Sequence, residues 1–499
     1  MFKYILVYCL IACITLKCFS QSSLGVFDGN GDIGKVNLKG SANFIPQTNQ
    51  YLVSGSGYNI WFHRDEFHLV WKKMKGDFIL YARGGLVGRG VDPHRKSGWM
   101  IRTSLDENAP HVSLAVHGDG LTSLQYRKEG GGETGEIKST VTNADVIQLE
   151  RTGFVYTIRV AEFGKPFVVE EVKDVNIGDE VYVGLFVNSH HPDVVESAVF
   201  SDVRIIKTAP EGFVQYRQYL GSYIELLNIT SGDREIVFTS PNSLQAPNWT
   251  PDGNTLIYNS NGLIYTFDLA TREPKELFTG NVRNNNNDHV LSFDGKMLGL
   301  SSGVQSLGGS IIYTVPVTGG VPKQITPRGP SYLHGWSPDG KYLVFTGERN
   351  KEFDIYKIPS KGGKEIRLTT SPGLDDGSEY TPDGKYIYFN SARTGTMQLW
   401  RMDADGSNQE PVTHGDFHDW FPHISPDGKW IVFLSFLKEE VKAEDHPFYK
   451  HVYLRLLPIE GGKPKVIAYF FGGQGSINTP SWSPDSKRVA FVTNTDLTQ

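Results

Sequence analysis

Apolar and polar residues alternate with a period of two along most of the chain. The alternation is clear at residues 67–71, 77–83, 111–116 and 180–187, and Gly, Asn and Asp residues separate such stretches. Successive side chains of a strand point to opposite faces of a sheet, so this period predicts half-buried strands. Gly and aromatic residues are plentiful, which suits many short strands joined by tight turns. The chain, which shows no long helical period, is therefore predicted to be all-β.

A short turn motif recurs six times in the second half. Its usual form is Ser-Pro-Asp-Gly-Lys, and its copies begin at residues 250, 292, 337, 381, 425 and 483. Pro presets φ at the first turn position, Asp can bond its own backbone, and Gly accepts a positive φ. Four strands fit between most successive motifs, which is the size of one propeller blade. The last interval is longer, and it contains an insertion at roughly 437–450.

The two ends of this repeat region predict how a ring of blades closes. A single strand at 488–493 follows the last motif, whereas two strands at 222–229 and 235–240 precede the first motif. Six motifs imply six blades, so we infer that the last blade combines strands from both ends. A run of separate hairpins would instead leave open sheet edges. Residues 213–499 are therefore predicted to form a six-bladed β-propeller.

The repeat resembles that of the TolB-like β-propellers. The resemblance lies in Ser-Pro-Asp-Gly-Lys after an aromatic residue, in the β-branched strand that follows and in Asp-Ile-Tyr at 354–356, and it covers about 213–495. It implies the fold but does not decide the activity. Propellers of this kind include Tol-system envelope proteins, gating domains of peptidases and oligogalacturonate lyases.

The first half is predicted to be a separate domain, because 499 residues are too many for one core. About a dozen strand-like stretches within residues 22–207 favour a two-sheet sandwich. Residues 208–212 then form a linker to the propeller. The stretches 97–102 and 110–114 resemble concanavalin-like jelly-roll domains, as do 76–78 and 200–203.

The jelly-roll resemblance implies a sugar-binding or spacer module. Exposed aromatic side chains could stack on sugar rings, and the candidates are Trp61, Trp71, Trp99 and Tyr126. The alternative for each is a place in the core of the sandwich, which is the more common role of such residues.

Residues 1–20 have the pattern of a cleaved secretory signal. Lys3 precedes an apolar run at 4–16 that is too short to span a bilayer, and all three cysteines lie within this segment. Lipidation of Cys18 is a weaker alternative, because Lys17 precedes it. We therefore expect a secreted or periplasmic protein with no disulfide and no transmembrane segment. The formal net charge is −6 and no long basic run occurs, so no nucleic-acid partner is expected.

The residues just upstream of the turn motifs are candidates for chemistry, because the first strand of each propeller blade lines the central channel. In one blade these upstream residues are Asn284–Asn287 and Asp288. Across five blades the selected candidates are His289, His334, Asp375, Asp376, Glu379, His418, Asp419, His423, Gln474 and Asn478.

Three interpretations of this polar channel remain open. In the first, His334 and His423 bind a divalent metal, as neutral imidazoles can. The resemblance to oligogalacturonate lyases supports a metal that neutralises a uronate carboxylate during β-elimination. In the second, Asp375, Asp376 and Glu379 act as general acids and bases. In the third, the channel is filled with water and performs no chemistry.

We assign roles to the candidates on the enzymatic interpretations. The catalytic set is His334, Asp375, Asp376, Glu379 and His423, and the substrate-binding set is His289, His418, Asp419, Gln474 and Asn478. Spacing alone does not complete a ligand set, because His334 lies three residues before its motif and His423 two before its own. The insertion could cover the channel as a lid, although a solvated loop is the more common outcome.

The sequence thus predicts a secreted or periplasmic protein that binds a carbohydrate. It could also process a polysaccharide or oligosaccharide as a metal-dependent lyase or as a glycosidase. The alternative is a non-enzymatic, TolB-like envelope protein that docks a protein partner.

Overall fold

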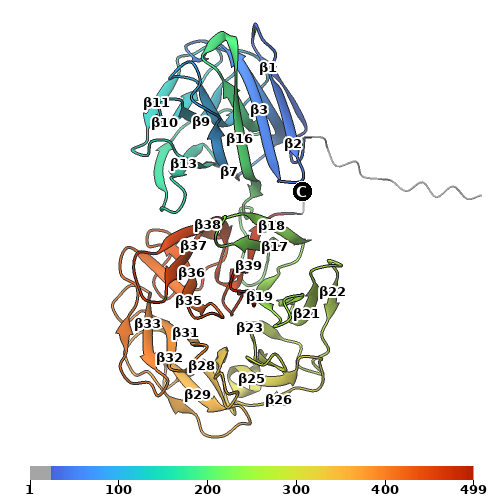
Figure 1. Ribbon diagram of the computed structural model, residues 1–499, viewed down its shortest axis with the longest axis vertical. Helices are drawn as coiled ribbons and strands as arrows, with labels where there is room; N and C mark the ends of the chain where they lie inside the picture. Colours follow the sequence, from blue (N-terminus) through green and yellow to red (C-terminus); the bar gives the residue numbers. More distant parts are fainter. Residues whose placement is uncertain (1–23, 498–499) are drawn as a thin grey trace, which may run out of the picture.

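The computed structural model describes residues 24–497, so the signal-like segment at 1–20 lies outside the described residues. Regular structure in the described part is almost entirely β, with two short 3₁₀ helices at η1 (Gln305–Leu307) and η2 (Gln474–Ser476). A pair of sheets lies above a ring of smaller sheets in Figure 1. The prediction of an all-β protein is confirmed. No helix within residues 24–497 is long and apolar enough to cross a membrane.

The upper half contains two seven-stranded sheets in which all neighbours pair antiparallel. The first has the order β1 (Gly29–Ile33), β6 (Phe67–Met74), β15 (Val181–Asn188), β8 (Lys96–Arg102), β9 (His111–His117), β10 (Thr122–Arg127), β11 (Gly135–Lys138). The second has the order β14 (Val168–Val172), β13 (Val155–Ala161), β12 (Val146–Thr152), β7 (Phe78–Leu86), β16 (His191–Lys207), β3 (Gln50–Gly57), β2 (Ser41–Ile45). A small hairpin joins β4 (Ile60–Trp61) to β5 (Arg64–Asp65).

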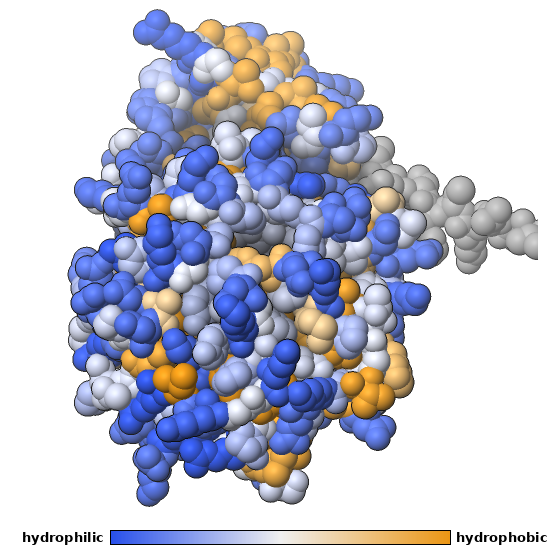
Figure 2. Space-filling view, turned by 60° about the horizontal axis from the view of Figure 1, so that its bottom comes forward, coloured by the Kyte–Doolittle hydropathy of each residue, from blue (hydrophilic) through white to orange (hydrophobic). Residues whose placement is uncertain are grey.

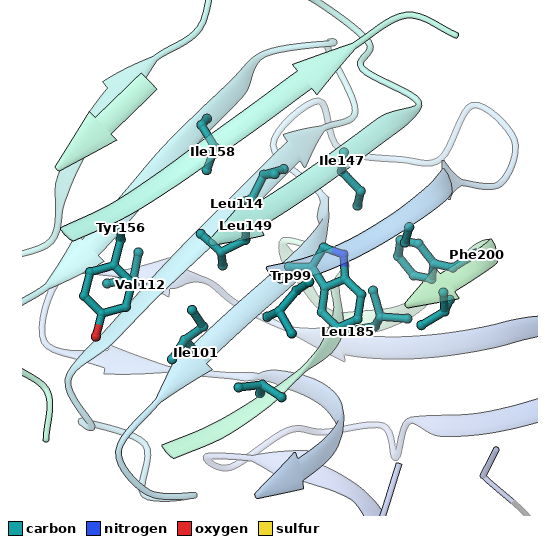
Figure 3. Packing of buried hydrophobic residues seen from close by; sticks show 14 of the residues in the cluster. Trp99, Ile101, Val112, Leu114, Ile147, Leu149, Tyr156, Ile158, Leu185 and Phe200 are labelled. Atoms are coloured by element: carbon teal, nitrogen blue, oxygen red, sulfur yellow. The ribbon is translucent and has the colours of Figure 1, made fainter. Parts of the chain in front are cut away.

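The inner faces of the two sheets form one apolar core (Figure 3). Trp99 and Leu114 of the first sheet and Leu149 of the second are fully buried in it. For Trp99 this position confirms the core role, so its ring is not exposed for stacking on a sugar. Tyr126 packs partly buried against the same core, and Trp71 against a second cluster. The predicted jelly-roll path of the chain through these sheets stays a prediction.

Five four-stranded sheets make up most of the ring. They are β19 (Gln245–Trp249), β20 (Thr255–Ser260), β21 (Leu263–Asp268), β22 (Pro274–Glu276); β23 (Asn285–Leu291), β24 (Met297–Val304), β25 (Gly309–Pro316), β26 (Lys323–Gln324); β27 (Ser331–Trp336), β28 (Tyr342–Arg349), β29 (Glu352–Pro359), β30 (Ile366–Arg367); β31 (Asp375–Tyr380), β32 (Tyr386–Ser391), β33 (Gln398–Asp403), β34 (Glu410–Pro411); and β35 (Phe417–Ile424), β36 (Trp430–Leu437), β37 (Lys450–Pro458), β38 (Lys465–Gly472).

The sixth blade joins the two ends of the repeat region. It has the order β18 (Arg234–Ser240), β17 (Gly221–Asn228), β39 (Arg488–Thr495). β17 pairs antiparallel with β39 along its whole length, and a bridge from Trp482 to Val489 continues the blade toward the channel. The predicted six-bladed propeller and its manner of closure are confirmed.

The turn motif folds through the hydrogen bonds that its residue types allow. In the copy at 337, the Ser337 hydroxyl donates to Asp339 Oδ1 over 2.7 Å, and the Lys341 amide donates to the same oxygen over 3.1 Å. The Tyr342 amide then donates to Ser337 Oγ, while Gly340 takes a φ of +70°. Each copy therefore sets a tight turn between the first and second strands of its blade.

The two halves share a buried interface. Arg234 of β18 contacts Asp202 of β16 at 2.9 Å and Glu225 of β17 at 3.0 Å, and Arg204 of β16 also contacts Glu225. Tyrosines from both halves pack beside these ion pairs, and the Tyr469 hydroxyl donates to the Lys165 carbonyl over 2.6 Å. The sandwich and the ring are thus in direct contact beside the segment that joins them. The exact domain boundaries at 207 and 213 stay predictions.

Candidate functional site

A cavity of about 1090 Å³ opens at one mouth of the propeller channel. It lies where the first strands of several blades begin, whereas the turn motifs lie at the other ends of those strands and face the opposite mouth. Hydrophilic residues cover most of the propeller in the view of Figure 2. Amide groups dominate the lining of the cavity, which includes Gln245, Asn259, Asn261, Asn284, Asn285, Asn286, Asn287, Gln305 and Gln474.

Asp376 of β31 is the centre of the ionisable groups in this cavity. Its Oδ1 accepts a hydrogen bond from Thr346 Oγ1 over 2.7 Å and lies 2.9 Å from His334 Nε2. Its Oδ2 lies 3.1 Å from Nε2 of His446, which belongs to the insertion. Burial alone would raise the pKa of Asp376, but the two histidines outweigh burial and hold that pKa well below its usual range. Asp376 is therefore an ionised group already supplied with partners.

Asp288 of β23 is the second buried carboxyl group of the cavity. Asn478 Nδ2 donates to its Oδ1 over 2.8 Å. Burial raises the pKa of Asp288 to about 6, because its hydrogen bonds and the neighbouring histidines only partly replace water. The same carboxyl group and Asp376 together raise the pKa of His334 above its usual value, against the effect of burial.

Glu379 and His423 form a separate buried pair whose polar atoms bond to each other and to the backbone. His423 Nδ1 lies 2.7 Å from Glu379 Oε2, and His423 Nε2 lies 2.7 Å from the Ile477 carbonyl. The other carboxyl oxygen of Glu379 accepts the Ile424 amide over 3.0 Å. Burial is the largest influence on Glu379 and raises the pKa of its carboxyl group. Glu379 borders a smaller, mostly apolar pocket of about 260 Å³ at the opposite mouth.

The predicted carboxylates Asp375 and Asp419 are bound inside their own blades. Arg393 Nη2 donates to both oxygens of Asp375, over 3.1 and 2.9 Å. Asp419 accepts the Ser435 hydroxyl over 2.6 Å and lies 3.3 Å from Arg455. Neither side chain lines the mouth cavity.

Two predicted histidines are also held away from the cavity. His289 Nε2 lies 3.3 Å from the Ile257 carbonyl, and burial lowers the pKa of this histidine to about 4. His418 Nδ1 accepts the Met397 amide over 3.2 Å. Of the ten predicted site residues, His334, Asp376 and Gln474 line the cavity, and Asn478 contacts it through Asp288.

The sequence did not assign site roles to several lining residues. His446, Glu444 and Asp445 come from the insertion between β36 and β37, so this segment forms a wall of the cavity. Tyr216 and Tyr219 come from the segment before β17 and lie at the same mouth. The long interval before the last motif is the only sequence signal for the first group.

The predicted metal ligands do not lie in one cluster. His334 contacts Asp376, whereas His423 contacts Glu379 and a backbone carbonyl. No group of three or more His, Cys, Asp or Glu side chains in residues 24–497 is arranged to hold a metal ion. The geometry thus adds no support to a divalent metal at these histidines.

Comparison with known proteins finds relatives of the propeller. Residues 333–446 match the family model of the TolB beta propeller domain. Atu1656, an uncharacterised protein of Agrobacterium fabrum, is 43% identical over 288 residues, which are 58% of this chain and 95% of the relative.

Solved structures give a similar result. A protein of Agrobacterium tumefaciens, provisionally assigned as TolB, is 43% identical with a TM-score of 0.53; the match covers 56% of this chain and all of that one. TolB from Acinetobacter baumannii is 15% identical with a TM-score of 0.40, over 66% of this chain and 79% of that one.

Proposed function

Because this chain belongs to the TolB-like β-propeller family, we propose that it is a non-enzymatic envelope protein whose propeller mouth docks a segment of a protein partner. Its 43% identity to a protein provisionally assigned as TolB supports this function over polysaccharide processing, for which the relatives offer no support. The envelope location is part of the proposal.

The observation that carries the proposal is a set of buried polar atoms without partners on residues that line the cavity. These atoms are Asn259 Oδ1, Asn285 Oδ1, Asn287 Nδ2 and Ser310 Oγ. A buried polar group left unpaired costs about 1–3 kcal/mol, so a ligand that supplies partners is favoured. The set contains acceptors and donors, which are the groups that the amides of an extended peptide segment require.

The pairing of the three carboxylates predicted to be catalytic argues against their acting as general bases. A general base needs an available lone pair and a pKa near the working pH. Glu379 and Asp375 are occupied by His423 and Arg393, and the low pKa of Asp376 makes it a weak base. Ser301 lies in a Gly-x-Ser-x-Gly stretch, but it is buried within β24 and its hydroxyl accepts the Leu333 amide.

Photo-cross-linking from the mouth tests this function. A photoreactive residue at Asn284, which is exposed on the rim, should cross-link a discrete protein in an envelope extract. The matched control is the same residue at Asn254, which is exposed in a turn motif at the opposite mouth. Equal cross-linking from both positions, or glycan-array binding without any cross-linked protein, would contradict the proposal.

A neutral oligosaccharide is the second candidate ligand. The amide-rich lining supports it, because amides and hydroxyls also pair with sugar hydroxyls. In that case a soluble oligosaccharide, and not a peptide, should protect the thiol of an Asn284→Cys variant from labelling.

A further inference from the structure

We infer that the partner segment is positively charged, and that a lysine or arginine side chain enters the cavity and places its cationic group beside Asp288 and Asp376. This inference rests on the proposed docking of a protein segment and names the chemistry of that segment. Neither the relatives nor the turn motifs indicate a positive charge on the partner.

The charged side chains that line the cavity, apart from its histidines, are all acidic. None of the described residues that line it is Lys or Arg, whereas four are acidic: Asp288, Asp376, Glu444 and Asp445. His334 and His446 both contact Asp376, so any charge they carry offsets mainly that carboxylate. The remaining carboxylates would repel an anionic ligand, such as the uronate of the metal-dependent lyase interpretation, and would attract a cation.

The four carboxylates differ in depth. Glu444 and Asp445 are exposed on the insertion, whereas Asp288 and Asp376 are only 5% and 4% exposed. Attraction between charges is stronger where water is excluded. The outer pair is therefore placed to steer a cation to the mouth, and the inner pair to hold it.

A second observation points to a ligand in the same place. The amide oxygens of Asn259 and Asn285 have no partner, although these residues are only 4% and 5% exposed and line the cavity. Ammonium and guanidinium groups carry three and five N–H donors and no acceptor. A cationic side chain would thus satisfy unpaired acceptors while its charge faces the carboxylates.

The rim suits the apolar part of such a side chain. Tyr216 and Tyr219 are 55% and 43% exposed at this mouth, and the Tyr216 hydroxyl is fixed by the His446 carbonyl. Lysine and arginine carry alkyl stems that pack against aromatic rings while the charged end reaches a polar group.

Selection of displayed random peptides on the purified full chain tests the inference. Selected peptides should be enriched in Lys or Arg. Replacing the critical Arg by neutral citrulline should weaken binding roughly tenfold or more. Affinity should also fall when sodium chloride rises from about 50 to about 500 mM.

Variants of the chain locate the contact. Asp288→Asn keeps a hydrogen-bonding oxygen toward Asn478 and should remove most of the preference for Arg over citrulline. Asp445→Asn is exposed, so it keeps the fold intact and should slow association. The matched control is Asp416→Asn, whose side chain is 98% exposed and does not line the cavity. It should change neither the preference for Arg over citrulline nor the rate of association.

The outcomes separate this inference from the proposed function. The chain has no cysteine after residue 20, so Asn284→Cys can carry a bulky label at the mouth and Asn254→Cys the same label at the opposite mouth. If the mouth label blocks peptides that show no preference for Lys or Arg, the charge inference is wrong and docking stands. If the mouth label blocks no selected peptide, both are wrong.

Discussion

At the scale of single residues, the channel histidines and carboxylates serve two different purposes. Asp376 and His334 line the mouth cavity, whereas Glu379 and His423 are closed off nearer the opposite mouth. The second pair fastens neighbouring blades, because β31 supplies Glu379 and β35 supplies His423. We therefore expect it to act on stability.

The variant His423→Ala should lower the free energy of unfolding by about 3 kcal/mol, because it leaves the buried Glu379 carboxyl group and the Ile477 carbonyl without their partner. Urea denaturation measures this loss. The control His414→Ala alters an exposed side chain and should change stability by less than about 0.5 kcal/mol. A stable His423→Ala protein that no longer binds its partner would instead give His423 a binding role.

Sequence spacing could not show which channel residues face the mouth cavity and which form the closed pair, and the reason lies in the local strand structure. The pairing register shifts between Asp376 and Glu379 in β31, and between Trp420 and His423 in β35. Such bulges break the strict alternation of side chains, so counting back from a turn motif does not give their direction. The positions near the channel were predictable, but the direction of each side chain was not.

At the scale of elements, the fold of the second half was predictable because one repeat encodes one blade. The six turn motifs predicted six blades, and the leftover strands predicted that β17, β18 and β39 share the last one. The insertion was one candidate for a cover of the channel, but its contact of His446 with Asp376 spans 70 residues and follows no local pattern, so the residues of the contact were not predictable.

Removal of β39 should open the ring. A chain that ends before Arg488 would leave the edge of β17 unpaired and the blade core around Ile224 exposed. We expect this chain to lose cooperative thermal unfolding and to aggregate, as measured by calorimetry and light scattering. A control that lacks only residues 498–499 keeps β39 and should unfold like the full chain.

At the scale of the whole molecule, buried ion pairs fasten the sandwich to the propeller. Asp202, Arg204, Glu225 and Arg234 form one group, in which Arg234 and Glu225 are 3% and 0% exposed. The sequence could not predict it, because its members pair across two domains. Such a group ties the two halves into one unit, so we expect them to unfold together.

The variant Arg234→Met should destabilise the interface by about 2–3 kcal/mol, because the buried carboxylates of Asp202 and Glu225 then share Arg204 alone. Thermal unfolding should then separate into two transitions, which differential scanning calorimetry would detect. Arg272→Met removes an exposed ion pair with Glu235 and should keep a single transition. One unshifted transition in Arg234→Met would show that the ion pairs do not couple the halves.

His451 makes a second part of the interface dependent on pH. It contacts Glu150 of the sandwich at 3.1 Å and Glu440 of the insertion at 3.0 Å. Burial lowers the pKa of His451, but the two carboxylates outweigh burial and raise it to about 9. Its stabilising contribution is therefore complete below about pH 6.5, the unfolded pKa, and is lost as the pH rises through about 9.

The stability difference between the natural chain and His451→Gln should follow the same range. We expect a difference on the order of 2 kcal/mol near pH 6, which shrinks toward zero by about pH 10. Denaturation curves at a series of pH values measure it. A difference that stays constant across this range would mean that packing, and not charge, is what His451 contributes.

The pairing of β17 with β39 also determines how the molecule responds to tension. Eight residue pairs join these strands, and the chain passes from β16 of the sandwich to β17 through one short segment. A pull between the sandwich and a partner held in the propeller mouth would reach the ring through the ion pairs from β16 to β17 and β18 and through the start of β17. The pairing of β17 with β39, which closes the ring, would therefore also bear part of the load from a tethered partner.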